Sequence, residues 1–135
     1  FQKPEKTVVG VEFSGNPHKG SFAQFRPVFE RARKLGMPVA LHCAEVDADG
    51  ETSEILEFFP ERFGHAVVLS EQQVRWMVDH RHRANVEICP TSNMRTLHLT
   101  ELNQHPTIAR WLEGDVPFCV CTDDSGVFAT SLSNE

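Results

Sequence analysis

The stretch Pro117-Phe118-Cys119-Val120-Cys121-Thr122-Asp123-Asp124 joins an apolar run directly to a pair of acids. Residues 117–122 carry no charge and are rich in β-branched, aromatic and cysteine side chains, which predicts a buried strand. Two carboxylates at the end of such a strand repel each other and are hard to keep ionised without a cation. The pair therefore indicates a metal site or a site of buried proton transfer. The simpler alternative is a loop start that caps the next helix.

The same succession of an apolar strand and a polar strand end recurs along the chain. Strands are expected at 7–13, 38–43, 62–69, 85–89 and 117–122, and helices at 21–35, 52–59, 70–80, 106–112 and 128–134. Pro27 conflicts with a helix that begins at Ser21, so we expect its start nearer Gln24. Alternating strands and helices predict a parallel sheet with helical crossovers, either doubly wound or part of a (β/α)8 barrel. A whole barrel typically needs about 250 residues, so five strands supply only part of one.

The bulk composition is that of one soluble globular domain. The chain has 135 residues, of which 40% are apolar and 24% charged, with a formal net charge of −6. Its Lys and Arg residues are scattered, which argues against nucleic-acid binding. No apolar run is long enough to cross a bilayer and no signal peptide is found, so we expect a cytoplasmic protein without a membrane partner. The chain starts at Phe1 and ends at Glu135 without a helix stop, so we expect it to be part of something larger.

The four cysteines each lie in or at the end of an apolar run: Cys43, Cys89, Cys119 and Cys121. Because none forms a CxxC pair, we expect small buried side chains in a reduced protein rather than a disulfide framework. Cys119 and Cys121 share one face of their strand. They could bind a soft metal, but packing in the core is the preferred interpretation.

Polar residues gather where each predicted strand ends. These ends are Ser14-Gly15-Asn16, His42-Cys43-Ala44-Glu45, Gly64-His65, Pro90-Thr91-Ser92-Asn93 and Thr122-Asp123-Asp124-Ser125-Gly126. In parallel α/β folds, ligands bind outside the carboxyl ends of the strands. The strand ends together therefore predict a binding or catalytic site more strongly than any one of them.

Four of these residues have a structural and a functional interpretation. His42 follows an apolar strand and is either a hydrogen-bonded structural residue or, as we prefer beside carboxylates, a ligand of Zn²⁺ or Fe²⁺. Glu45 is either an acid at a helix entry or a general acid. His65 could be a second ligand, a base or a group that stabilises the transition state. Gly15 either forms a turn or offers its backbone to a planar ligand.

The remaining candidates carry less information. Glu12 and Glu87 lie inside predicted strands, where a position in the barrel interior is possible. Four histidines lie in polar stretches and are expected at the surface: His80, His82, His98 and His105. There is no GxGxxG and no P-loop, so a dinucleotide-binding or NTPase domain has no support.

Taken in order, the strand-end motifs resemble the adenosine/AMP deaminase family of the metal-dependent amidohydrolases, from about Val8 to the end of the chain. The motifs are Gly15, His42-Cys43-Ala44-Glu45, Gly64-His65, Cys89-Pro90-Thr91-Ser92-Asn93 and Thr122-Asp123-Asp124-Ser125-Gly126-Val127-Phe128. Residues 14–17 and 125–135 are most similar to the adenosine deaminase-like branch, which hydrolyses N6-methyl-AMP and related nucleotides. The resemblance implies the C-terminal part of a (β/α)8 TIM barrel, with residues 1–135 forming a partial domain that lacks the N-terminal strands.

The resemblance also implies a zinc-dependent hydrolytic deamination at C6 of a purine. His42 and Asp123 would be ligands of Zn²⁺, which lowers the pKa of a bound water to about 7. Glu45 would be the protonated acid that contacts purine N1, and His65 would orient the attacking hydroxide. The amine or methylamine would leave, giving inosine or IMP.

The resemblance further implies that Asp124 contacts purine N7 and that the backbone of Gly15 contacts N3. The partner is thus a purine nucleoside or nucleotide monophosphate, and the full-length protein is expected to be a monomer. The family takes two further metal ligands from a His-x-His pair on its first strand. The only such spacing here, His80-Arg81-His82, falls beyond a helix and is not accepted as that pair. The alternatives are a fragment without activity of its own and an amidohydrolase with another substrate.

Overall fold

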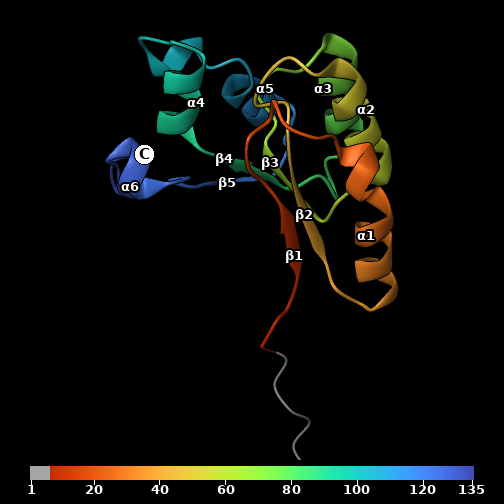
Figure 1. Ribbon diagram of the computed structural model, residues 1–135. Coiled ribbons are helices and arrows are strands. Elements are labelled where there is room, and N and C mark those ends of the chain that lie inside the picture. The colour runs from red at the N-terminus through yellow and green to blue at the C-terminus, as the bar shows by residue number, and fades with distance from the viewer. Residues whose placement is uncertain (1–6) are drawn as a thin grey trace, which may run out of the picture.

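The computed structural model describes residues 7–135, which form one parallel five-stranded sheet with helices between the strands (Figure 1). The strands are β1 (Val11–Phe13), β2 (Val39–Cys43), β3 (Arg62–His65), β4 (Val86–Ile88) and β5 (Phe118–Val120). The helices are α1 (Phe22–Lys34), α2 (Asp49–Phe58), α3 (Glu71–Asp79), α4 (Pro90–Thr96), α5 (Ile108–Glu113) and α6 (Ser125–Phe128), with a 3-10 turn at Leu102–Gln104. The predicted partial domain 1–135 includes residues 1–6, which lie outside the described residues.

The strand order decides between the two predicted architectures. Every pair of consecutive strands is parallel and hydrogen-bonded, so the order is β1-β2-β3-β4-β5. A doubly wound sheet reverses its order at a switch point, whereas a (β/α)8 barrel does not. The sheet therefore has the arrangement of five consecutive units of a barrel, which confirms the predicted fold class.

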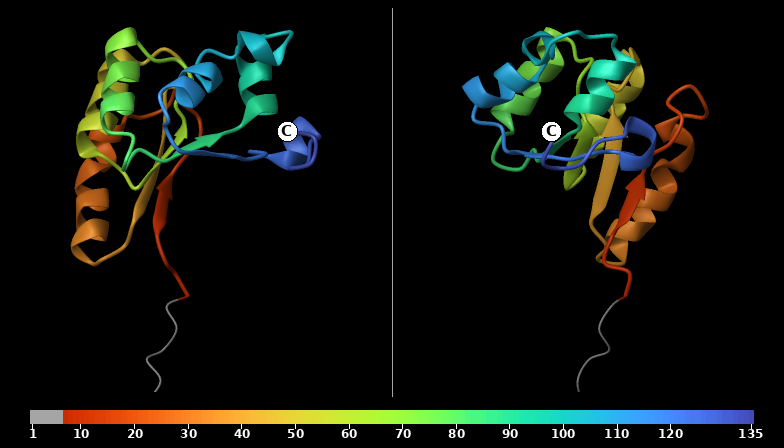
Figure 2. Two further views of the ribbon diagram at one scale, coloured as in Figure 1. Left: turned by 180° about the vertical axis from the view of Figure 1, so that it is seen from behind. Right: turned by 90° about the vertical axis from the view of Figure 1, so that its left-hand side faces the viewer.

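The hydrophobic core lies between the sheet and a layer of helices. In Figure 2, α1, α2 and α3 stand together on the side away from α6 and the C-terminus. The largest fully buried side chains come from both layers: Phe22, Leu41, Phe63, Met77 and Trp111. Burying a side chain of this kind contributes about 1.5–3 kcal/mol each. No helix within residues 7–135 is long and apolar enough to cross a membrane.

Helix α1 starts earlier than predicted. It begins at Phe22 rather than near Gln24 and contains Pro27. Phe22 is fully buried, and its ring lies 5.3 Å from that of Phe58. Packing of the first turn therefore outweighs the hydrogen bond that Pro27 cannot donate. Phe25, on the same helix, is 43% exposed.

Other elements also differ from the sequence prediction, among them α2, which begins at Asp49 rather than at residue 52. β3 ends at His65 rather than Leu69, because the backbone becomes left-handed at His65 and Ala66, with φ of 61° and 51°, and the strand cannot continue. The last helix is α6 at Ser125–Phe128 rather than 128–134, since Ala129 is left-handed with φ 51°. Helix α4, with Pro90 at its start, was not predicted.

Strand β5 is less buried than its apolar sequence predicts. Val120 is 40% exposed and Cys119 is exposed, because β5 pairs only with β4 in the described part of the chain. The prediction of a buried strand here is wrong, and so is that of buried thiols at Cys119 and Cys121. Their Sγ atoms do share a face, 3.7 Å apart. Cys43 and Cys89 are buried as predicted.

Candidate active site

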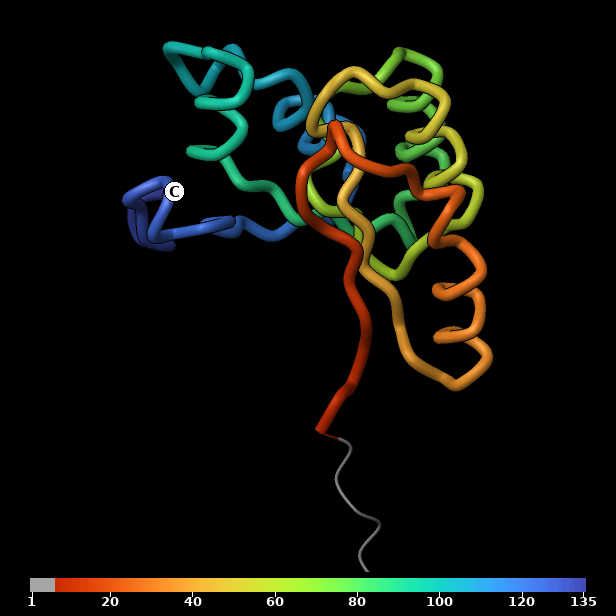
Figure 3. Tube along the Cα trace, viewed as in Figure 1, coloured from red at the N-terminus to blue at the C-terminus, as the bar shows by residue number. Residues whose placement is uncertain are grey.

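All six predicted site residues line one cavity of about 620 Å³. Its walls include Gly15, His42, Glu45, His65, Asp123 and Asp124. They lie at or just after the carboxyl ends of β1, β2, β3 and β5, and Figure 3 shows the turns after β1 and β2 next to each other. The volume is that of an ordinary small-molecule site. Residues far apart in sequence thus meet where a parallel sheet binds its ligands.

The pairing of β2 with β3 brings two histidines together. His42 is opposite Gly64, and Cys43 is opposite His65. A Cβ atom on Gly64 would lie 2.5 Å from Cδ2 of His42, so only glycine leaves room for this imidazole. The ring centroids of His42 and His65 are 4.7 Å apart.

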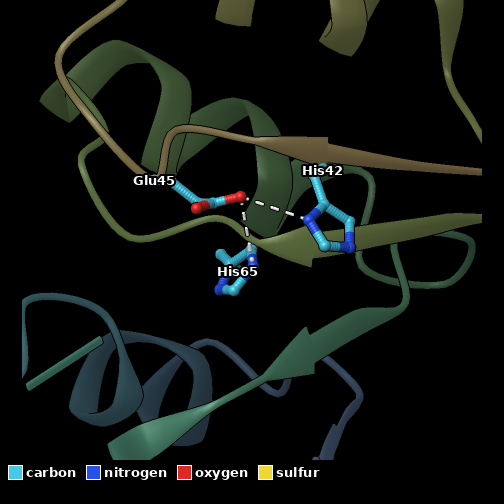
Figure 4. Close-up of side chains that lie close together, drawn as sticks. All are labelled: His42, Glu45 and His65. Atoms are coloured by element: carbon cyan, nitrogen blue, oxygen red, sulfur yellow. Dashed lines mark hydrogen bonds and ion pairs between the residues drawn. The ribbon is translucent and has the colours of Figure 1, made fainter. Parts of the chain in front are cut away.

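Glu45 lies between the two histidines, as Figure 4 shows. Its Oε1 is 3.1 Å from Nδ1 of His42 and 3.3 Å from Nε2 of His65. The other ring nitrogen of His42 is 2.9 Å from a carboxylate oxygen of Glu12. Burial disfavours the charged imidazole of His42, but the hydrogen bonds and negative charges of Glu45 and Glu12 outweigh burial and raise its pKa. Glu12, which the sequence left ambiguous, thus belongs to the site.

The pKa of His65 is shifted in the opposite direction to that of His42. His65 is 1% exposed, and burial lowers its pKa despite the opposing charge of Glu45. A lowered pKa keeps this imidazole neutral at pH 7. Its Nε2 lies 3.9 Å from Oδ2 of Asp123, so His65 stands between the acids of β2 and β5.

The two acids after β5 point to different surroundings. Asp123 faces His65 and accepts a hydrogen bond of 2.9 Å on Oδ1 from the backbone N–H of Asp124. Asp124 is exposed and lines the cavity. It precedes α6, but its side chain makes no capping hydrogen bond. Asp124 thus occupies the N-cap position of α6, as the alternative interpretation expected, but does not cap the helix through its side chain.

Left-handed backbone is concentrated at these strand ends. Three non-glycine residues beside the cavity, Ala44, His65 and Asp123, have φ of 53°, 61° and 55°. Such residues cost about 1–3 kcal/mol each and persist where the surroundings impose them. Gly15, with φ of 125°, adopts a conformation that favours glycine.

Two residues behind the cavity wall, Asn93 and His105, were given no individual role from the sequence. The amide of Asn93 lies 2.9 Å from Nδ1 of His65 and 3.2 Å from Nε2 of His105. His105 is 5% exposed, so its predicted surface position is wrong. The residues around His105 are mostly polar and show no periodic apolar pattern, so the sequence did not predict that His105 is buried. Asn93 was visible only as the last residue of a polar strand end.

The other histidines lie away from the cavity. His82 and His98 are exposed as predicted. His80 stacks on Trp76 with ring centroids 4.1 Å apart, at the end of α3. His80-Arg81-His82 therefore contributes nothing to the cavity wall, in agreement with its rejection as a ligand pair.

The chemistry of the donor set fits part of a metal shell. Two groups have all their donor atoms within 4.8 Å of one another: His42, Glu45 and His65, and His65, Cys89 and Asp123. Imidazole and carboxylate donors suit Zn²⁺ and Fe²⁺. A carboxylate on one ring nitrogen of His42 would correspond to the contact found behind ligating imidazoles, whereas the other nitrogen would have to exchange its carboxylate for the metal. The two predicted ligands, His42 and Asp123, fall in different groups, so the described residues do not close a shell.

Comparison with known proteins gives a consistent result. The family model described as adenosine deaminase matches residues 2–135. The adenosine deaminase-like protein of Drosophila melanogaster is 38% identical over 95% of this chain and 37% of its own length. The N6-mAMP deaminase of Arabidopsis thaliana is 39% identical over 95% of this chain and 35% of its own length. The solved structure of an ADAL–IMP complex has a TM-score of 0.87 at 38% identity, over 94% of this chain and 36% of that one. The chain thus spans little more than a third of these relatives.

Proposed function

The chain belongs to the adenosine deaminase family, and from this premise we propose that the full-length protein containing it deaminates a purine nucleotide at C6. The observation that carries the proposal is the single cavity that holds all six residues predicted from the strand ends. Relatives named N6-mAMP deaminase and a relative solved with IMP favour N6-methyl-AMP as the substrate. The balanced reaction is N6-methyl-AMP plus water giving IMP plus methylamine.

The proposed acid is Glu45. Its Oε1 contacts the imidazoles of His42 and His65, which fixes the direction of the carboxyl group at the cavity wall. In the protonated form it would donate to purine N1 as the ring takes up charge. A positioned general acid typically contributes about 10²–10⁴-fold to the rate.

Two other residues would position the purine. Asp124 is exposed to the cavity, where a carboxyl group can contact N7. Gly15 lies on the same wall, and a Cβ built on it would meet no atom within 4 Å. Its backbone is therefore open to a planar ring, in keeping with a contact to N3.

Zinc is the proposed cofactor, and its ligands in this chain would be His42 and Asp123. A bound zinc ion would lower the pKa of its water to about 7 and so supply hydroxide at neutral pH. A ligating imidazole binds the ion through one ring nitrogen and donates from the other. One of the two carboxylates now on His42, Glu45 or Glu12, could therefore orient the ring, and the other would give way to the ion. His65, neutral and buried next to Asp123, would orient the attacking water.

The substitution Glu45→Gln tests this proposal in the full-length protein. Glutamine keeps the size of the side chain but cannot supply the proton, so kcat for N6-methyl-AMP should fall by about 10²–10⁴-fold. Glu57→Gln, on the exposed face of α2, is the matched control and should leave kcat unchanged. Unchanged turnover in Glu45→Gln would contradict the assigned role.

A substrate panel tests the alternative of another amidohydrolase. Release of amine from N6-methyl-AMP, AMP, adenosine and guanine should be compared at equal enzyme concentration. The proposal expects the N6-methyl nucleotide to have the highest kcat/KM. Activity confined to guanine would favour the alternative.

A further inference from the structure

A line of buried hydrogen bonds runs from the cavity to the start of helix α5. Nδ1 of His65 lies 2.9 Å from Nδ2 of Asn93, and Oδ1 of Asn93 lies 3.2 Å from Nε2 of His105. Nδ1 of His105 faces the backbone N–H groups of Thr107 and Ile108 at 3.4 and 3.3 Å. His65, Asn93 and His105 are only 1%, 3% and 5% exposed. Water therefore has little access to any of the three side chains.

The direction of these bonds is set by the backbone. A peptide N–H can only donate, so Nδ1 of His105 must accept. Burial lowers the pKa of His105, so the ring is neutral and carries its single proton on Nε2. That proton is donated to Oδ1 of Asn93. The amide oxygen is thus occupied, and the NH₂ group of Asn93 is the one that faces His65.

The last bond fixes the tautomer of His65. Because the NH₂ group of Asn93 donates, Nδ1 of His65 must accept, and the proton of the neutral ring resides on Nε2. We propose that Asn93 and His105 are positioning residues that hold His65 as the Nε2–H tautomer, so that it presents a hydrogen-bond donor to the cavity. The hydrogen-bond assignment rests on the distances and the burial of the three side chains. Its catalytic consequence rests on the proposed function.

This tautomer selects among the three roles that the sequence left open for His65. A protonated Nε2 has no lone pair, so it can neither bind a metal ion nor accept a proton. It can donate to an oxygen atom, and its nearest acceptors are Oε1 of Glu45 at 3.3 Å and Oδ2 of Asp123 at 3.9 Å. His65 would therefore orient an oxygen nucleophile between these acids rather than deprotonate it.

His105 is needed because an amide group has nearly the same shape after a 180° rotation. A rotated Asn93 would offer its oxygen to His65 and stabilise the opposite tautomer. The rotation would also bring the NH₂ group of Asn93 against the N–H of His105, leaving two buried donors without an acceptor. Such a loss costs about 1–3 kcal/mol per group, which holds Asn93 in one orientation.

The substitution Asn93→Asp in the full-length protein inverts the final bond without changing its size. A carboxylate can only accept, so His65 should move its proton to Nδ1. The ¹⁵N shifts of the ring nitrogens, measured with ¹⁵N-histidine, should show Nε2–H in the parent protein and Nδ1–H in the variant. Asn134→Asp, at an exposed position, is the matched control and should leave the tautomer unchanged. An Nδ1–H signal for His65 in the parent would overturn the inference.

Two substitutions of His105 separate positioning from packing. Glutamine can place an NH₂ donor where Nε2 of His105 lies, so His105→Gln should retain the Nε2–H tautomer and most of kcat. His105→Leu fills the space without a donor, so both tautomers of His65 should appear and kcat should fall by about 10-fold or more with KM little changed. Equal loss in both variants would mean that His105 serves only packing. His82→Leu, at an exposed position, is the control for the substitution itself.

The two readouts can fail independently. If the full-length protein releases no amine from any purine tested, the proposed function fails, but the ring nitrogens still report the tautomer. If deamination is found and Asn93→Asp leaves both the tautomer and kcat unchanged, the proposed function stands and the positioning role is wrong.

Discussion

Among single residues, Gly64 has the sharpest steric requirement. A methyl group on it would lie 2.5 Å from Cδ2 of His42, inside the contact distance of two carbon atoms. We predict that Gly64→Ala displaces His42 and lowers the free energy of unfolding by about 1–3 kcal/mol, as overpacking does elsewhere. Urea unfolding of the purified protein measures this change. Gly50→Ala in α2 meets no atom within 4 Å and should be neutral or slightly stabilising. Equal stability of both variants would contradict the prediction.

The buried histidines make stability depend on pH. The ordinary pKa of 6.5 is lowered in His105 and His65 by burial, so below 6.5 the unfolded chain binds more protons than the folded one. The free energy of unfolding then falls as the pH drops below 6.5. His42 acts in the opposite sense, because its raised pKa adds stability below 6.5 that is lost as the pH rises through the folded value.

His105→Gln removes one of the two groups that destabilise the protein in acid. We predict that the metal-free variant loses less stability than the parent between about pH 7 and about pH 5. Urea midpoints at both pH values give the comparison. His82→Gln removes an exposed histidine and should keep the parent's dependence. A steeper loss in His105→Gln would show that the sign is wrong.

Single residues of the site were predictable where a polar side chain directly follows an apolar strand. His42, Glu45 and Asp123 follow apolar runs, and the parallel sheet brings all three to one cavity. His105 gave no such signal, because it lies in the loop before α5, outside any element whose periodic pattern would predict its burial. The role of Asn93 could not be predicted either, because it depends on the contact with the buried His105.

At the scale of elements, α3 shows what local chemistry alone determines. Ser70 and Gln73 form a capping box, with the backbone N–H of Ser70 donating to Gln73 over 2.9 Å. The box lies within four residues, so the sequence contains all of it. The start of α1 and the position of α6 depend instead on Phe22 packing and on left-handed backbone, which no local pattern reveals.

Gln73 also ties α3 to α2. Its NH₂ group donates to the backbone and side chain of Asp49 at 3.2 and 3.0 Å and to Ser53 at 3.2 Å. Since Gln73 is buried, Gln73→Ala leaves these acceptors and the N-terminus of α3 without a partner. We predict a loss of about 2 kcal/mol in the free energy of unfolding, measured by urea denaturation. Gln72→Ala, exposed on the same helix, should change it by less than about 0.5 kcal/mol.

At the scale of the whole molecule, the sheet formed by residues 7–135 has two strands with a single neighbour, β1 and β5. Within residues 7–135 the metal donors form two groups that share His65, and neither group contains both His42 and Asp123. We predict that the 135-residue chain alone neither deaminates N6-methyl-AMP nor retains stoichiometric zinc through gel filtration. A full-length protein assayed beside it should do both. Stoichiometric zinc in a cooperatively folded 135-residue monomer would contradict the prediction.

The left-handed residues at the ends of β2 and β3 have a consequence for adaptation to heat. Ala44 and Ala66 hold φ of 53° and 51°, which glycine adopts without steric cost. Both alanines are buried, so a lineage selected for survival at high temperature would gain from glycine only where relief of backbone strain exceeds the loss of a buried methyl group. A lineage that must also keep turnover cannot make this replacement freely, because glycine would loosen the turns that aim Glu45 and His65. A change at Ala44 or Ala66 that favours thermal stability would therefore also disturb the geometry of the catalytic side chains.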